Sequence, residues 1–281
     1  MTPRLQSWFL HTPLFVMFVI APFFVPRPEV LFDLSTVTGV ISLLFTILIG
    51  FFIATATTNY LRLQTLLAQE NSSLISLCEI GSLIQPSAKR RLVDAVDLYA
   101  ITALNFELVD YVEKTIPAFA KLNKVLNQIR PSSGFGESLV QNFYDVKMQL
   151  ACTRQEIPLT ARRIVTWVHW IVLILLATLL IGLMYLLRDG SFLSSLVVGC
   201  LTVACYLTLR LLYQIDGNLF SEEKMTFLNS QIIFVSIGKL NYFPAYTIKQ
   251  RRVSRLVPPY RTGVFKNPAE PLPAEIKIVR K

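Results

Sequence analysis

One uninterrupted apolar stretch, Ile164–Leu187, most constrains what this chain can fold into. It contains no charged side chain, Arg162 and Arg163 precede it, and Arg188 follows it. As a helix it would be about 36 Å long at about 1.5 Å per residue, which exceeds the roughly 30 Å hydrocarbon core of a bilayer. The stretch therefore predicts a transmembrane helix and an integral membrane protein.

Three further segments have the composition of membrane spans. Residues 8–25 form a short apolar segment that Pro13 and Pro22 interrupt, residues 34–57 form a second span, and residues 192–213 form the last one. The N-terminal segment also has features of a signal peptide, but no small-residue cleavage site follows it. We therefore predict four spans, of which 164–187 and 192–213 form a tight antiparallel hairpin.

Between the second and third spans lies a segment of about 100 residues whose apolar side chains recur at helical period. No helix-breaking residue follows Thr57, so the second span is expected to continue as one helix to about Ile84, where Pro86 stops it. A further helix is expected from Ser87 to Pro117, which bends or ends it, and others are expected over 118–129 and over 137–156 up to Pro158.

The predicted fold class is an all-α membrane protein with four transmembrane helices. A cytoplasmic helical bundle is expected between spans two and three. The expected segments are an N-terminal membrane pair at 1–57, the helical module at 58–163, and a membrane hairpin at 164–213. Residues 214–281 are expected to form a helix running to about Lys239, followed by a basic, proline-rich tail.

The chain has a basic excess that is concentrated near its C-terminus. It contains 27 Lys and Arg against 18 Asp and Glu, for a net charge of +9. Residues 58–163 hold 12 basic and 10 acidic side chains, whereas residues 214–281 hold 11 and 5. In a membrane chain, a basic tail favours contact with an anionic membrane surface over binding of nucleic acid.

The basic residues next to the spans also predict orientation, because cytoplasmic loops carry an excess of Lys and Arg. The two short loops hold only Arg27 and Arg188. The other side holds Arg4, Arg62, Arg154, Arg162, Arg163, Arg210 and Lys224. We therefore expect both termini and the helical module in the cytoplasm. With no disulfide pattern in that module, the expected location is a bacterial inner membrane.

The sequence offers little that is typical of an enzyme or a metal protein. The four cysteines form no CxxC pair, and the two histidines, His11 and His169, are far apart in sequence. We find no Walker loop and no GxSxG, HExxH or GxGxxG motif, so no enzyme, metal or cofactor is expected. Glu107, Asp110 and Lys114 share a helical surface; a solvated face is the simpler interpretation, and a cation site or catalytic carboxylate pair is the alternative.

Small and hydroxyl-bearing residues recur near one face of the second span. Such a face either packs against another helix or lines a pore, because hydroxyls can replace part of an ion's hydration shell. A similar small, polar face in the last span carries Ser195, Gly199, Thr202 and Tyr206. The candidate pore-lining residues of the second span are Ser42, Thr46, Gly50 and Thr57. The large apolar residues expected on its opposite side are Leu43, Leu44, Ile47, Leu48, Phe51 and Phe52.

Two further groups are candidate functional residues. His169 lies between Trp167 and Trp170, and is either an interfacial hydrogen-bonding residue or a titrating gate. A basic cluster in the tail is either solvated or a contact for anionic lipid. Its members are Lys249, Arg251, Arg252 and Arg255.

Three short motifs share the layout of a known family. Ala88–Arg91 leads to Tyr99 and Glu107, Arg162 and Arg163 precede the third span, and Asp216 and Gly217 lie within Leu211–Phe220 after the fourth. Over about residues 34–240 the chain resembles the bestrophin-like domain proteins of unassigned function. Bestrophins proper are pentameric anion channels, so the resemblance implies an oligomeric channel with the second span at its axis.

Topology and resemblance together favour a homo-oligomeric channel for small anions in the lipid bilayer. The candidate pore face carries no Asp or Glu ring of the kind that favours cations. The alternative is a non-conducting membrane scaffold or regulator whose helical module and basic tail bind a cytosolic protein or anionic lipid. A monomer in detergent would exclude an axial pore and favour the scaffold.

Overall fold

The computed structural model describes residues 13, 16–25, 34–106, 108, 110–130, 137–217, 227–249, 253, 256–264 and 275–280. Over these residues the chain is mostly helical. It divides into two compact units. Unit 1 comprises Met1–Tyr60 and Arg163–Phe220, and unit 2 comprises Leu61–Arg162 and Ser221–Lys281.

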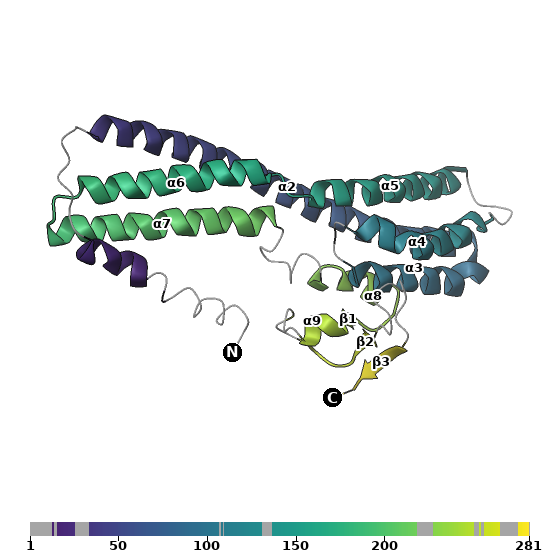
Figure 1. Cartoon of the computed structure of the whole chain (residues 1–281). Coiled ribbons are helices and arrows are strands. Elements are labelled where there is room, and N and C mark those ends of the chain that lie inside the picture. Colours follow the sequence, from purple (N-terminus) through teal and green to yellow (C-terminus); the bar gives the residue numbers. More distant parts are fainter. Residues whose placement is uncertain are drawn as a thin grey trace. The chain divides into compact units, whose positions relative to one another are not determined.

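The longest element is α2, a helix of 50 residues over Ser35–Ile84, drawn as one continuous ribbon in Figure 1. No proline interrupts it, and Pro86 follows its end, which confirms that the second span continues without a break. Its first 26 residues, 35–60, carry no charge and would extend about 39 Å at about 1.5 Å per residue. One side of this apolar part is buried, at spacings of three and four residues: Phe45, Ile49, Phe52, Ala56 and Tyr60.

Unit 1 also contains α6, Trp167–Leu187, and α7, Phe192–Asp216, which form the predicted hairpin. Among the described residues, α2, α6 and α7 are the three helices long and apolar enough to cross a membrane. Residues 16–24 are helical as well. Most of the remainder of the predicted first span, 8–25, lies outside the described residues.

The helix at 16–24 packs closely on α7 at a glycine. A Cβ added to Gly199 would lie 2.9 Å from both the Cα and the carbonyl oxygen of Val19. The rings of Phe18 and Tyr206 lie beside this contact, with centroids 5.8 Å apart. Ser195 and Thr202 of the same face are buried. The small, polar face of the last span is therefore a helix-packing face.

We expect Gly199→Ala to lower the stability of unit 1, because the new methyl group meets backbone atoms that cannot rotate away. Overpacking of this kind costs about 1–3 kcal/mol. A thermal unfolding scan in detergent measures the change. Gly182→Ala on α6 is the matched control, since a Cβ there would have no neighbour within 4 Å. Equal unfolding temperatures for the two variants would contradict the close contact.

In unit 2, a 3-10 turn at Pro86–Ala88 leads into α3, Lys89–Leu104, which is followed by α4, Tyr111–Asn127, and α5, Glu137–Ala161. Three predicted boundaries are wrong. The helix expected from Ser87 to Pro117 is divided between α3 and α4, Pro117 lies inside α4 rather than before a new helix, and Pro158 lies inside α5. The buried side chains on each helix continue past its proline, and this packing maintains the helix where one backbone hydrogen bond is lost. Those side chains include Thr115, Ala118, Leu122, Ile157 and Ala161.

The C-terminal part of unit 2 is not all-α, which corrects the predicted fold class. Helices α8, Gln231–Ser236, and α9, Ala245–Lys249, are short, and the predicted helix to Lys239 is not continuous. A three-stranded sheet has the order β1-β2-β3, with β1 parallel to β2 and β2 antiparallel to β3. Its strands are Tyr242–Pro244, Tyr260–Val264 and Glu275–Val279. Strands of three to five residues among prolines are too short to give a period-two signal.

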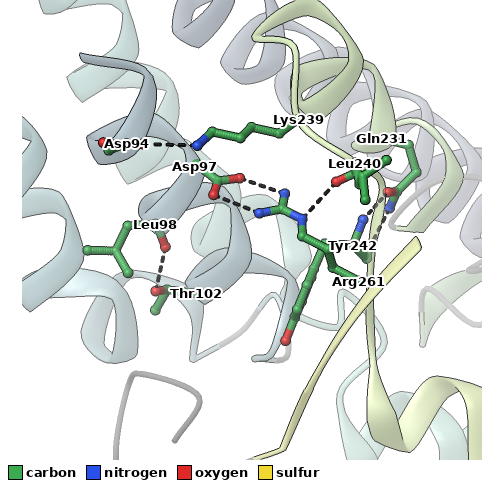
Figure 2. Close-up of polar contacts among 9 residues, drawn as sticks. All are labelled: Asp94, Asp97, Leu98, Thr102, Gln231, Lys239, Leu240, Tyr242 and Arg261. Atoms are coloured by element: carbon green, nitrogen blue, oxygen red, sulfur yellow. Dashed lines mark hydrogen bonds and ion pairs between the residues drawn. The ribbon is translucent and has the colours of Figure 1, made fainter. Parts of the chain in front are cut away.

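A buried arginine attaches this C-terminal part to α3, as Figure 2 shows. Arg261 donates two hydrogen bonds to the carboxylate of Asp97, at 2.7 and 2.8 Å, and one to the carbonyl oxygen of Leu240 at 2.9 Å. Lys239 reaches Asp94 on the same helix at 3.0 Å. Burial raises the pKa of the nearby Tyr242 to about 12. The sheet and α3 therefore form one packed body within unit 2.

Candidate functional site

The exposed side of the apolar part of α2, hereafter its outward side, carries the pore-lining residues that the sequence predicted. Thr46 and Gly50 are exposed, whereas Ser42 and Thr57 are half-buried at the edge of the packed side. A Cβ added to Gly50 or to Gly39 would have no neighbour within 4 Å. If these glycines allowed another helix of the same protomer to pack closely, an added Cβ would meet atoms of that helix. This face therefore packs against no other helix of the described chain.

Large apolar side chains lie next to Thr46 and Gly50 on the same outward side. Leu43, Ile47 and Phe51 follow one another at a spacing of four residues and are 61%, 58% and 61% exposed. The prediction that these three residues lie opposite the hydroxyl-bearing face is therefore wrong. The covered side instead carries Phe45, Ile49 and Phe52, so the outward side presents a ridge of large apolar residues beside its small ones.

Further along the same helix, in unit 2, the outward surface of α2 becomes polar. Thr65, Gln69 and Ser72 are exposed there and carry no charge. Arg62 is also exposed, and it pairs with Glu156 of α5 at 3.0 Å. Along one continuous helix the outward side thus changes from aliphatic and aromatic groups to hydroxyls and amides.

His169 lies in the first turn of α6, where its side chain is hydrogen-bonded. Its Nδ1 accepts a hydrogen bond from the backbone N–H of Thr166 at 3.3 Å and lies 3.0 Å from the Thr166 hydroxyl. Together they form a capping box at the helix start, and the imidazole contacts the ring of Phe52 with centroids 4.9 Å apart. This geometry supports the hydrogen-bonding interpretation of His169.

Asp216, at the end of α7, is a buried carboxylate to which sequence reasoning assigned no role. Its Oδ1 accepts hydrogen bonds from the backbone N–H groups of Ile164 at 2.8 Å and Val165 at 3.1 Å. These bonds fix the start of α6 against the end of α7. An acidic residue within the last turn of an apolar helix was the available signal, because such a residue needs a partner.

We expect Asp216→Ala to destabilise the hairpin by about 1–3 kcal/mol, because two N–H groups lose their acceptor. Asp216→Asn, which retains an oxygen acceptor, should lose less. The thermal unfolding temperature in detergent is the measurement. The control is Asp189→Ala, which removes an exposed carboxylate that accepts the Ser191 N–H at 2.9 Å. Similar losses for Asp216→Ala and Asp189→Ala would show that burial of Asp216 has no consequence.

The family of the chain follows from comparison with known proteins. A family model named Bestrophin-like, for the Bestrophin-like domain, matches residues 26–218. The chain belongs to this Bestrophin-like family. The match contains all three candidate spans and the helices α3 to α5. The Bestrophin-like chain is thus a membrane protein, as its apolar helices indicate.

Solved structures share the fold of this Bestrophin-like chain. A bacterial bestrophin homolog from Klebsiella pneumoniae matches with a TM-score of 0.60 at 12% identity, over 82% of this chain and 98% of that one. A tyrosine-to-alanine variant of a K. pneumoniae homolog matches with 0.61 at 11%, over 80% and 97%. A glycine-to-alanine variant described as a membrane protein matches with 0.62 at 12%, over 82% and 98%. A search of curated proteins finds no match.

The motif residues of the Bestrophin-like chain hold helices together. The Tyr99 hydroxyl donates to the carboxylate of buried Glu70 at 2.6 Å, which joins α3 to α2. Asp216 joins α7 to the start of α6. The similarity that the sequence showed at these positions therefore corresponds to helix contacts.

Of the remaining predicted site residues, the structure describes Lys249, Asp110 and Lys114. Lys249 is exposed at the end of α9, and Asp110 is exposed immediately before α4. Within the described ranges, no group of three or more His, Cys, Asp or Glu side chains could hold a metal ion. His11, Glu107, Arg251, Arg252 and Arg255 lie outside the described residues.

Proposed function

We propose that this chain assembles into a homo-oligomeric channel for small anions, with α2 around the axis. The proposal rests on the outward face of α2. It belongs to an unbroken helix of 50 residues, and a Cβ at Gly50 would meet nothing within 4 Å. Several copies of α2 around an axis would bring these faces together and enclose a path.

The side chains on this face suit an anion. The segment 35–60 contains no Asp or Glu, so a ring of copies would present no carboxylates to repel chloride. In the proposed lining Thr46 and Gly50 face the path, with Ser42 and Thr57 at its edges. Leu43, Ile47 and Phe51 would form an apolar constriction, which gates by excluding water. We propose that His169, whose ring contacts Phe52, influences the position of α2.

The polar continuation of α2 would rehydrate the ion beyond the constriction, through Thr65, Gln69 and Ser72. The basic residues flanking the spans favour an orientation with both termini and unit 2 in the cytoplasm. A cytoplasmic module without a disulfide pattern fits a bacterial inner membrane. The exposed Lys249 and the neighbouring Arg251, Arg252 and Arg255 would then face the anionic cytoplasmic leaflet.

Chloride efflux from liposomes tests the channel proposal. Purified full-length chain is reconstituted, and efflux is followed with a potassium ionophore present to prevent charge build-up. We expect efflux well above that of empty liposomes, and a mass in detergent that corresponds to several copies. Efflux equal to that of empty liposomes at every tested voltage, calcium concentration and pH would contradict the proposal.

One observation favours the alternative function, a scaffold that binds a cytosolic partner. Exposed basic side chains lie near the α2–α3 turn and the end of α4, and no described acid forms an ion pair with any of them. An acidic protein segment would complement this surface. A monomer in detergent that binds an acidic protein would support the scaffold function. The basic side chains of this surface are Lys89, Arg90, Arg91, Lys124 and Arg130.

A further inference from the structure

Arg163 is held in a defined position at one end of the α6–α7 hairpin. Its guanidinium lies 5.1 Å from the centroid of the Tyr213 ring, a cation–π contact. The next two residues, Ile164 and Val165, donate their N–H groups to Asp216, one turn beyond Tyr213. The backbone next to Arg163 and the ring beneath its side chain are therefore fixed together.

Further aromatic side chains lie at this end of the apolar helices. The ring of Trp170 meets that of Tyr213 edge to face, with centroids 6.1 Å apart. Trp167 is 73% exposed and Tyr213 is 45% exposed, although both are large and partly apolar. Exposed Trp and Tyr at the ends of spans are typical of the membrane–water interface. In a bilayer that α6 and α7 span, the Arg163 guanidinium would lie at the level of the lipid headgroups.

The charge at this end of the hairpin is positive. Arg210 lies one turn before Tyr213, and within the described part of the chain no acid forms an ion pair with Arg163 or Arg210. The nearby carboxylate of Asp216 is buried and bonded to backbone N–H groups. A guanidinium matches a phosphate well, because it donates two parallel hydrogen bonds.

Beyond the tryptophans, α6 presents an apolar surface along its length. Val168, Ile171 and Ile174 are each about half exposed. Such a surface matches acyl chains and gives no contact for a free inorganic anion. The combination of a guanidinium that no described acid pairs with, interfacial rings and an apolar surface therefore matches one amphipathic molecule.

We propose that Arg163, Tyr213 and the aromatic residues beside them bind an anionic phospholipid, with the lipid phosphate on Arg163. The site does not depend on ion conduction, so it holds whether or not the channel proposal does. Arg163 supplies the charge, and Tyr213 is the positioning residue that holds its side chain.

Lipid binding to the full-length protein in detergent tests the site. Phosphatidylglycerol is the anionic probe, phosphatidylcholine the zwitterionic control, and inorganic phosphate the test for a free anion. We expect phosphatidylglycerol to raise the unfolding temperature more than phosphatidylcholine does, and phosphate to have no effect. Arg163→Gln should weaken retention of phosphatidylglycerol in native mass spectra about fivefold, the change expected for one basic residue at an anionic surface. Tyr213→Leu should weaken it as well, and Tyr213→Phe should not.

Arg90→Gln is the matched control, because it removes the same charge from an exposed position on α3. It should leave lipid retention unchanged, and all variants should unfold at the wild-type temperature in phosphatidylcholine. Full retention of phosphatidylglycerol by Arg163→Gln would overturn the proposal. Equal stabilisation by inorganic phosphate, or a loss of oligomer mass in Arg163→Gln, would also overturn it, by indicating a free-anion site or a contact between copies.

Discussion

Phe51→Ala is expected to raise chloride efflux from liposomes by about tenfold, the change that corresponds to a barrier lower by about 1.4 kcal/mol. Phe51 is 61% exposed on the outward side of α2, beside Gly50. If copies of this face enclose the ion path, the phenyl rings narrow it and exclude water, and their removal allows the ion to stay hydrated. Efflux measured at equal protein content per liposome gives the ratio.

The control is Phe24→Ala, which removes an equally large side chain that is 80% exposed on unit 1 but does not belong to α2. It should leave efflux unchanged. The double variant Ile47→Ala with Phe51→Ala should conduct more than Phe51→Ala alone. If Phe51→Ala leaves the efflux rate at the wild-type level, Phe51 does not form the constriction.

Arg261→Ala is expected to cost unit 2 about 3–5 kcal/mol, because it leaves a largely buried carboxylate without its counterion. The paired side chains of Arg261 and Asp97 are only 11% and 14% exposed. The loss should release the sheet from α3. Limited proteolysis followed by mass spectrometry should then show faster cleavage after Lys239 or Lys249.

The exposed pair between Arg62 and Glu156 gives the matched comparison, since these side chains are 64% and 46% exposed. Arg62→Ala should cost no more than about 1 kcal/mol, as exposed ion pairs do. Replacing both Asp97 and Arg261 with apolar residues of similar size should recover much of the stability, since neither charge then remains buried alone. Equal proteolysis rates for Arg261→Ala and Arg62→Ala would contradict the role of the buried pair.

Local sequence signals predicted the long apolar helices of unit 1. The uncharged stretch 164–187 lies largely within α6, and the lack of any break after Thr57 predicted that α2 would run on to Ile84. Helical periodicity also placed Thr46 and Gly50 on one face. It did not show which side of α2 is covered, because that depends on elements distant in sequence. Leu43, Ile47 and Phe51 were therefore missed as outward residues.

Long-range pairing explains the other differences. The ion pair of Asp97 has no local signal, since its partner Arg261 is 164 residues away. The sheet was missed because β1 is only three residues long and its partner β2 follows a proline pair. The role of Asp216 likewise depends on backbone groups of Ile164 and Val165, which carry no signal in the sequence.

Chemical modification of a cysteine at Thr46 tests most directly whether α2 lines an anion path. Thr46→Cys is placed in a chain whose Cys152, Cys200 and Cys205 are replaced, which leaves only buried Cys78. A small, negatively charged thiol reagent is added from the aqueous side while chloride efflux is recorded. Thr178→Cys, at an exposed threonine of α6, is the control. We predict that modification at position 46 blocks efflux and that position 178 has no effect. Efflux that persists after complete modification at position 46 would contradict the account.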